Sequence, residues 1–218
     1  MIIEYTHASS FPLLLFIIFI LLFLFKIHIM KHVYEKVGIP LPWISLLLFL
    51  SLAGSFIDIP LWQISPSPQP CTWFLRFFSL TPPAPPSKIT IAMNVGGAII
   101  PIFISLSLLS KAHRPERTML AIFFVSIIVH AFARPVPHIG ITVPTLLPAA
   151  SAALSAYLFD RQAVSRTAYI AGSMGTLIGA DLAYMFKLGD LGISIASIGG
   201  MGTFDGIYVS GIMAVLMA

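Results

Sequence analysis

Seven apolar stretches constrain the fold of this chain more than any other feature. A helix needs about 20 apolar residues to cross the hydrocarbon core of a bilayer. The candidate spans are residues 11–29, 41–61, 90–109, 118–133, 141–159, 168–186 and 193–218. The sequence therefore predicts one integral membrane domain over residues 1–218. We expect an all-α, polytopic transmembrane helix bundle of about seven spans, within a range of six to eight, with helices interrupted at glycines.

The composition agrees with a surface that faces lipid. Only 9% of the residues are charged and 58% are hydrophobic, with a mean hydropathy of +0.97. Soluble domains carry about a quarter charged residues, and a soluble chain of this size could not hide so much apolar surface from water. The net charge is +4, but the basic residues are scattered over predicted loops. The expected partner is the lipid bilayer, and nucleic acid is not expected.

The basic residues predict an orientation. Eight of the 12 Lys and Arg residues flank the first, third and fifth connections, and four lie on the other side. Cytoplasmic loops carry an excess of Lys and Arg, so we expect the N-terminus outside and the C-terminus inside. The first apolar run is too long for a signal peptide and is preceded by Glu4 rather than by positive charge, which predicts a retained first span.

The second connection, residues 63–89, is the only long one. Its prolines favour an extended, extramembrane loop, and its aromatic patch from Trp73 to Phe78 favours the membrane interface. The patch is interpreted either as an interfacial anchor or as a lid over an outward-facing site. The only cysteine, Cys71, lies in this loop, so the chain cannot form an internal disulfide.

Two aspartates lie inside predicted spans, Asp181 in the sixth and Asp205 in the seventh. A charge at the bilayer centre costs about 2.5–3.5 kcal/mol on insertion scales, which indicates a function. We expect a turn near residues 189–192 to make these spans antiparallel neighbours and to bring both carboxyl groups to a similar depth. Two carboxyls in a low-dielectric site share a proton, as in an aspartyl protease or a proton-coupled transporter. A structural role for each Asp is the third interpretation.

Further polar residues are expected in the same, outer half of the membrane. They form a candidate substrate- or ion-binding group with two glycine pairs that open spans three and seven: Asp58, Asn94, Gly96, Gly97, His130, Arg134, Gly199 and Gly200. Glycine-interrupted helices expose N–H groups that can bind a polar ligand. Arg134 is expected either to neutralise one of the acids or to lie at the interface. The spacing of Gly175 and Gly179 is typical of close helix packing.

No metal and no other cofactor is expected. His130 and His138 are conceivable metal ligands beside an aspartate, but the sequence has no HExxH or similar spacing. A lone histidine inside a membrane is more often a hydrogen-bonded packing residue.

Several segments resemble a family of prokaryotic membrane proteins, found in archaea and bacteria, that is catalogued only as a domain of unknown function. The resemblance rests on segments that begin at Gly54, Asn94, Ala133, Gly140, Gly175 and Ala196. It implies a polytopic fold in the plasma membrane of a prokaryote, without an established activity. The chain has Asp58 where that pattern has Asn and His138 where it has Gly, so neither residue is essential in its present form.

The two aspartates are also loosely similar to those of presenilin-type intramembrane aspartyl proteases. Ala180-Asp181-Leu182 is like their Tyr-Asp element, and Gly202-Thr-Phe-Asp-Gly is like their Gly-x-Gly-Asp element. Phe204 replaces the second glycine, and no Pro-Ala-Leu element follows Asp205. The resemblance implies catalysis by Asp181 and Asp205 on a membrane-protein or peptide substrate. A proton- or cation-coupled transporter or channel subunit for a small ion or solute, and a non-catalytic assembly factor, are the alternatives.

Overall fold

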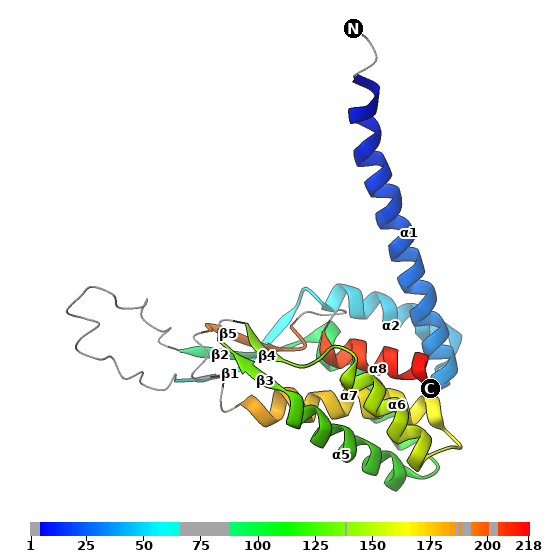
Figure 1. Cartoon of the computed structure of the whole chain (residues 1–218), viewed down its shortest axis with the longest axis vertical. Helices are drawn as coiled ribbons and strands as arrows, with labels where there is room; N and C mark the ends of the chain where they lie inside the picture. The colour runs from blue at the N-terminus through cyan, green and yellow to red at the C-terminus, as the bar shows by residue number, and fades with distance from the viewer. Residues whose placement is uncertain (1–4, 66–87, 138, 186–187, 189–192, 201–204) are drawn as a thin grey trace, which may run out of the picture.

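The computed structural model describes residues 5–65, 88–137, 139–185, 188, 193–200 and 205–218. Helices dominate this part of the chain, as predicted, but five short strands accompany them (Figure 1). The elements are α1 (Tyr5–Val37), α2 (Leu41–Gly54), β1 (Asp58–Ile64), β2 (Ile89–Asn94), the π-helix η1 (Val95–Ile99), α4 (Ile100–Ser110), α5 (Pro115–Phe132), β3 (Arg134–Val136), β4 (Gly140–Thr142), α6 (Leu147–Phe159), α7 (Val164–Thr176), the π-helix η2 (Leu177–Leu182), β5 (Ile195–Ile198) and α8 (Gly206–Met217).

Helix α7 forms the centre of the bundle and packs against α4, α5, α6 and α8. Small residues along α7 let its neighbours approach closely. A Cβ on Gly172 would meet the backbone of Ser210 in α8, and one on Gly175 would meet the side chain of Val125 in α5. Gly179, in η2, lies equally close to the backbone of α5. The predicted role of Gly175 and Gly179 in close helix packing is therefore confirmed.

Helix α1 contacts the rest of the molecule mainly through its C-terminal part. Met30, Val33, Tyr34 and Val37 are buried, and the Tyr34 hydroxyl donates a hydrogen bond to the Tyr208 hydroxyl of α8 at 3.3 Å. The large apolar residues from Leu15 to Phe25 whose side chains are described are exposed instead, and the N-terminal part of α1 stands clear of the bundle (Figure 1). Such a surface would be unfavourable in water.

Two helical segments are long and apolar enough to cross a membrane, Leu15–Val37 and Pro115–Phe132. Four further apolar helices are shorter, namely Pro42–Gly54, Val95–Ser110, Leu147–Phe159 and Gly206–Met217. Large apolar side chains on several helices face outward, for example Phe103 at 68% and Phe123 at 64% exposure. The apolar character of the chain is thus carried on its outside as well as in its core.

The prediction of an all-α fold is wrong at the ends of three expected spans. Strands β1, β2 and β5 form a sheet in the order β1-β2-β5, in which β1 pairs antiparallel and β5 pairs parallel with β2. These strands occupy the end of the second expected span, the start of the third and the start of the seventh. Their isoleucines and Thr90 suit an extended backbone. Pro60 sits at a register irregularity in β1, where a missing N–H is tolerated.

The fifth expected span is also shorter than predicted, because α6 begins only at Leu147. Residues 140–142 form β4, which pairs with β3 in a two-stranded hairpin. Pro144 lies between this hairpin and the helix, and Pro148 occupies the first turn of α6, where proline costs no hydrogen bond.

Helix interruption near glycines, which the sequence predicts, takes the form of two π-helical segments. Segment η1 follows β2 directly and contains Gly96 and Gly97. Segment η2 continues α7 and contains Gly179 and Asp181. Short π-helical segments are rare and often lie at functional sites, and here each of them follows or contains a candidate site residue.

Candidate functional site

Asp181 and Asp205 line the same cavity. Asp181 lies in the last turn of η2, and Asp205 directly precedes α8. The helices are antiparallel, since Gly172 faces Ser210 while Asp181 approaches Asp205 at the other end of the same pair. The expected turn at residues 189–192 lies outside the described residues.

Local structure holds Asp205 in place. It is the N-cap of α8, and its Oδ2 accepts a hydrogen bond from the backbone N–H of Ile207 at 2.9 Å. Asp and Asn are preferred at this position because the first N–H groups of a helix have no partner within it. The carboxyl group therefore keeps a defined direction at the start of α8 and is half-buried. Asp181, also half-buried, is directed by the wider turn of η2.

Both aspartates line one cavity of about 380 Å³. Its remaining lining is largely apolar and consists of Ile91, Ile139, Gly140, Ile141, Met185, Leu188, Ile193, Ile195, Ala196, Ser197, Ile198 and Gly200. The whole of β5 and most of β4 thus border the cavity. Among the described strands, β5 pairs only with β2 and β4 pairs only with β3. Each of these strands therefore presents one edge that no described strand occupies.

A second polar cluster joins the sheet to the helices. The Nδ2 of Asn94 donates hydrogen bonds to the Ser55 carbonyl oxygen at 2.9 Å and to Oδ1 of Asp58 at 3.1 Å. Its Oδ1 accepts a hydrogen bond from the Gly97 N–H at 2.9 Å. The Ser197 hydroxyl of β5 donates to the same Asp58 oxygen. Asn94 is 0% exposed, so its hydrogen bonds are used to fasten β1, β2 and η1 together.

The predicted glycine pairs lie in this second cluster. A Cβ on Gly96 would overlap the Ser51 carbonyl oxygen of α2, and Gly199 has a φ of +72° and packs on the backbone of Gly97 and Ala98. Gly200 differs, because it lines the cavity of the two aspartates. For the other three glycines the structure gives a packing role, and ligand binding by them stays a prediction.

His130 and Arg134 lie apart from the two aspartates. Arg134 is exposed in β3, and neither aspartate forms an ion pair with it in the described structure. The expected neutralisation of an acid by Arg134 is thus not seen, because β3 carries the side chain to the surface. The ring of His130 stacks on that of Tyr184 with centroids 5.0 Å apart. His130 is exposed and lines a separate, apolar groove on α5.

Sequence reasoning missed Tyr184 and Ser197. The Tyr184 hydroxyl donates to the carbonyl oxygens of His130 at 3.2 Å and Ala133 at 3.0 Å, which ties the chain just after Asp181 to the end of α5. The sequence offered only their positions as a clue: Tyr184 lies three residues after Asp181, and Ser197 lies beside the Gly199-Gly200 pair.

His138, Cys71 and the loop segment 66–87 lie outside the described residues. Within the described part, no three His, Cys, Asp or Glu residues cluster as metal ligands would.

Comparison with known proteins gives a family but no function. No curated protein and no solved structure matches the chain. The model of a family described as "Protein of unknown function (DUF1614)" matches residues 52–217, a range that contains both aspartates, the sheet and both π-helical segments. Because this match covers most of the sequence, the chain belongs to the DUF1614 family.

Proposed function

We propose that the chain is a polytopic membrane protein in which Asp181 and Asp205 act together to hydrolyse a peptide bond. The observation that carries this proposal is the shared cavity, which both aspartates and all four residues of β5 line. Among the described strands, one edge of β5 is unoccupied. The outward-facing apolar residues of α1, α4 and α5 support the membrane location. About seven spans, the N-terminus outside and the C-terminus inside remain part of the proposal, as does the plasma membrane of a prokaryote.

The proposed chemistry needs one ionised and one protonated carboxyl group, and two acids that repel each other favour that state. The ionised aspartate takes a proton from water, and the water oxygen attacks the carbonyl carbon of the substrate. The protonated aspartate donates its proton to the carbonyl oxygen, which stabilises the tetrahedral intermediate. When the C–N bond breaks, the C-terminal fragment leaves as an amine that takes a proton from the carboxyl that acted as base. The N-terminal fragment leaves as a carboxylic acid, and one hydroxyl proton of the intermediate returns to the other aspartate, which restores the starting state.

The strand β5 gives the substrate a place to bind. An extended peptide can add to an open strand edge through main-chain hydrogen bonds, and residues 195–198 of β5 border the cavity that contains both carboxyls. A peptide in this position would present its backbone carbonyl groups, which are the reactive groups, toward the acids. Apolar residues around the cavity favour an apolar peptide, such as an unwound segment of a membrane protein.

The test uses full-length protein in liposomes and a fluorogenic, apolar peptide library. Asp181→Asn and Asp205→Asn should each reduce cleavage by about 100-fold or more, because each leaves only one carboxyl. Glu35→Gln is the matched control, since it removes an exposed carboxylate on α1. Each variant should keep the thermal unfolding midpoint within a few degrees of wild type. Full cleavage by either Asp variant would disprove the paired mechanism.

A proton- or cation-coupled transporter is the second candidate. Segment η2 favours it, because interrupted helices beside an acidic residue are common at ion-binding sites of transporters. The same liposomes, loaded with a pH-sensitive dye, distinguish the two. Proton flux that depends on Asp181, without peptide cleavage, would replace the hydrolase with the transporter. Absence of both activities would leave a non-catalytic assembly factor as the remaining class.

A further inference from the structure

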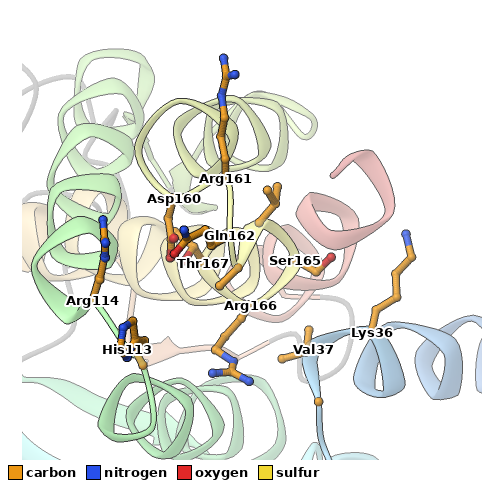
Figure 2. Close-up of a pocket in the computed structure, with 14 residues that line it drawn as sticks. Lys36, Val37, His113, Arg114, Asp160, Arg161, Gln162, Ser165, Arg166 and Thr167 are labelled. Carbon is orange, nitrogen blue, oxygen red and sulfur yellow. Dashed lines mark hydrogen bonds between the residues drawn. The ribbon is translucent and has the colours of Figure 1, made fainter.

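A second cavity lies at the opposite end of α7 from the two aspartates. It has a volume of about 580 Å³ and is lined by three connections, α1–α2, α4–α5 and α6–α7 (Figure 2). The α7–η2 helix runs from Val164 at this cavity to Leu182 beside the acids, a length of about 28 Å at 1.5 Å per residue. The two cavities are therefore separate sites at opposite ends of one helix.

The lining of this cavity is strongly basic. Three basic side chains, Lys36, Arg114 and Arg166, line it against a single acid, Asp160, which gives a formal charge of +2 with His113 neutral. Arg161 also borders the cavity, but its guanidinium lies over the Tyr157 ring and is not counted. No ion pair joins these cations to a described carboxylate. Asp160 is only 5% exposed, and its carboxylate accepts a hydrogen bond from the Thr167 hydroxyl at 2.8 Å. The acid thus faces into the protein, while the uncompensated positive charge remains around the cavity.

Arg166 has unused hydrogen-bonding capacity. One of its terminal nitrogens donates to the Lys111 carbonyl oxygen at 3.3 Å, which links the α6–α7 and α4–α5 connections. Its Nε is buried and has no hydrogen-bond partner in the described part of the chain. A planar guanidinium with free N–H groups matches the oxygens of a phosphate group.

A helix N-terminus adds to this site. The first four residues of α7, Val164 to Thr167, line the cavity, and the N-cap of α7, Ala163, makes no side-chain hydrogen bond to the first N–H groups. The first N–H groups of a helix carry partial positive charge and bind phosphate readily. The cavity therefore combines basic side chains with the N–H groups at the start of α7, and both favour the same kind of ligand.

We propose that this cavity binds a phosphate-bearing anion, either the headgroup of an anionic phospholipid or a soluble phosphate ester. Its size falls in the usual range for small-molecule sites. In the proposed topology the three connections lie on the cytoplasmic side, where the leaflet is rich in anionic lipids and basic pockets between helices bind their headgroups. The site does not depend on the chemistry of Asp181 and Asp205.

The experiment measures binding to purified full-length protein in neutral detergent by calorimetry. The probes are a short-chain phosphatidylglycerol, a diacylglycerol with the same chains, and inorganic phosphate. Wild type should bind phosphatidylglycerol about tenfold more tightly than diacylglycerol, and Arg166→Gln and Arg114→Gln should each remove most of that difference. Arg161→Gln is the matched control, because the Arg161 guanidinium lies over the Tyr157 ring, 4.7 Å from its centroid, and turns away from the other labelled cations (Figure 2).

The outcomes decide both the proposal and the source of the phosphate. If millimolar inorganic phosphate competes with the lipid, the cavity recognises the phosphate group itself. If phosphate does not compete, the site is assigned to the lipid headgroup. Equal affinity for phosphatidylglycerol and diacylglycerol, or wild-type affinity in both test variants, would overturn the proposal. If Arg166→Gln does not fold, Arg114→Gln decides alone, since its side chain makes no hydrogen bond with the described residues that its loss would break. Asp181→Asn should bind the lipid like wild type, which separates this site from the proposed hydrolase.

Discussion

At the scale of single residues, Gly96 lies where η1 packs directly on the backbone of α2. A Cβ there would overlap the backbone carbonyl oxygen of Ser51 and the backbone nitrogen of Ser55. The neighbouring Asn94 is buried and uses both its N–H₂ group and its oxygen in hydrogen bonds. These two residues fix how the sheet joins the helix bundle, so their contribution is structural even though they were first identified as candidate ligands.

The replacement Gly96→Ala should destabilise the protein by about 1–3 kcal/mol, because the backbone it would touch cannot move without shifting α2. The measurement is the thermal unfolding midpoint of purified protein in detergent. Gly206→Ala is the matched control, since a Cβ at Gly206 meets only the Thr176 methyl group at 3.7 Å, an ordinary contact. Equal midpoints for the two variants would show that α2 and η1 are not packed as described.

At the scale of elements, the site is built where helices give way to other backbone forms. Asp181 lies in a π-helical segment, Asp205 caps a helix, and β5 borders the cavity between them. The interior of a regular helix satisfies its own backbone hydrogen bonds and leaves no edge for a ligand. The departures from regular helix therefore create the features on which the proposed hydrolase depends.

Tyr184 tests the link between η2 and α5. Tyr184→Phe removes a hydroxyl that donates to the His130 and Ala133 carbonyl oxygens. We expect a loss of about 1–2 kcal/mol in stability, together with a fall in any activity that depends on Asp181. The matched control is Tyr157→Phe, because Tyr157 is 54% exposed and the ring that contacts Arg161 is kept. A stable, fully active Tyr184→Phe protein would mean that this contact does not position Asp181.

At the scale of the whole molecule, the chain has two chemically different ends. The acids and the three-stranded sheet lie at one end of α7, and the basic cavity lies at the other. The basic residues look scattered in the sequence, but the fold gathers the α1–α2, α4–α5 and α6–α7 connections around one cavity. This polarity agrees with the proposed topology, in which the basic connections face the cytoplasm.

The orientation can be tested with Cys71, the only cysteine of the chain. In intact cells that express the protein, a membrane-impermeant maleimide should label Cys71, because the 63–89 loop is predicted outside. A Cys71→Ser protein carrying Gln162→Cys, in the α6–α7 connection, should react only after the membrane is permeabilised. The reverse pattern would invert the proposed topology, and the basic cavity would then face the outer side.

Composition and the lengths of the apolar stretches were enough to predict the helical character and the apolar exterior, because these are local properties. The pairing of Asp181 with Asp205 stays a prediction, and the structure shows that both residues line one cavity. The strands were not predicted, because Ile-rich segments of four to seven residues are compatible with either strand or helix until a partner strand is known. Hydrogen bonds join Asp58 to Asn94 and to Ser197 only because β1, β2 and β5 pair in one sheet.

The positions of Arg134, of His130 and of the basic residues around the second cavity depend on the tertiary structure. Arg134 and His130 belong to the same expected half of the membrane as the acids, but strand β3 and the outer face of α5 carry them away from the cavity. The basic cavity required three connections, separated by about 75 and 50 residues in the sequence, to meet at one end of α7. Contacts over such distances depend on how the helices pack against each other, and helix packing is set by the matching of side-chain surfaces rather than by any local pattern.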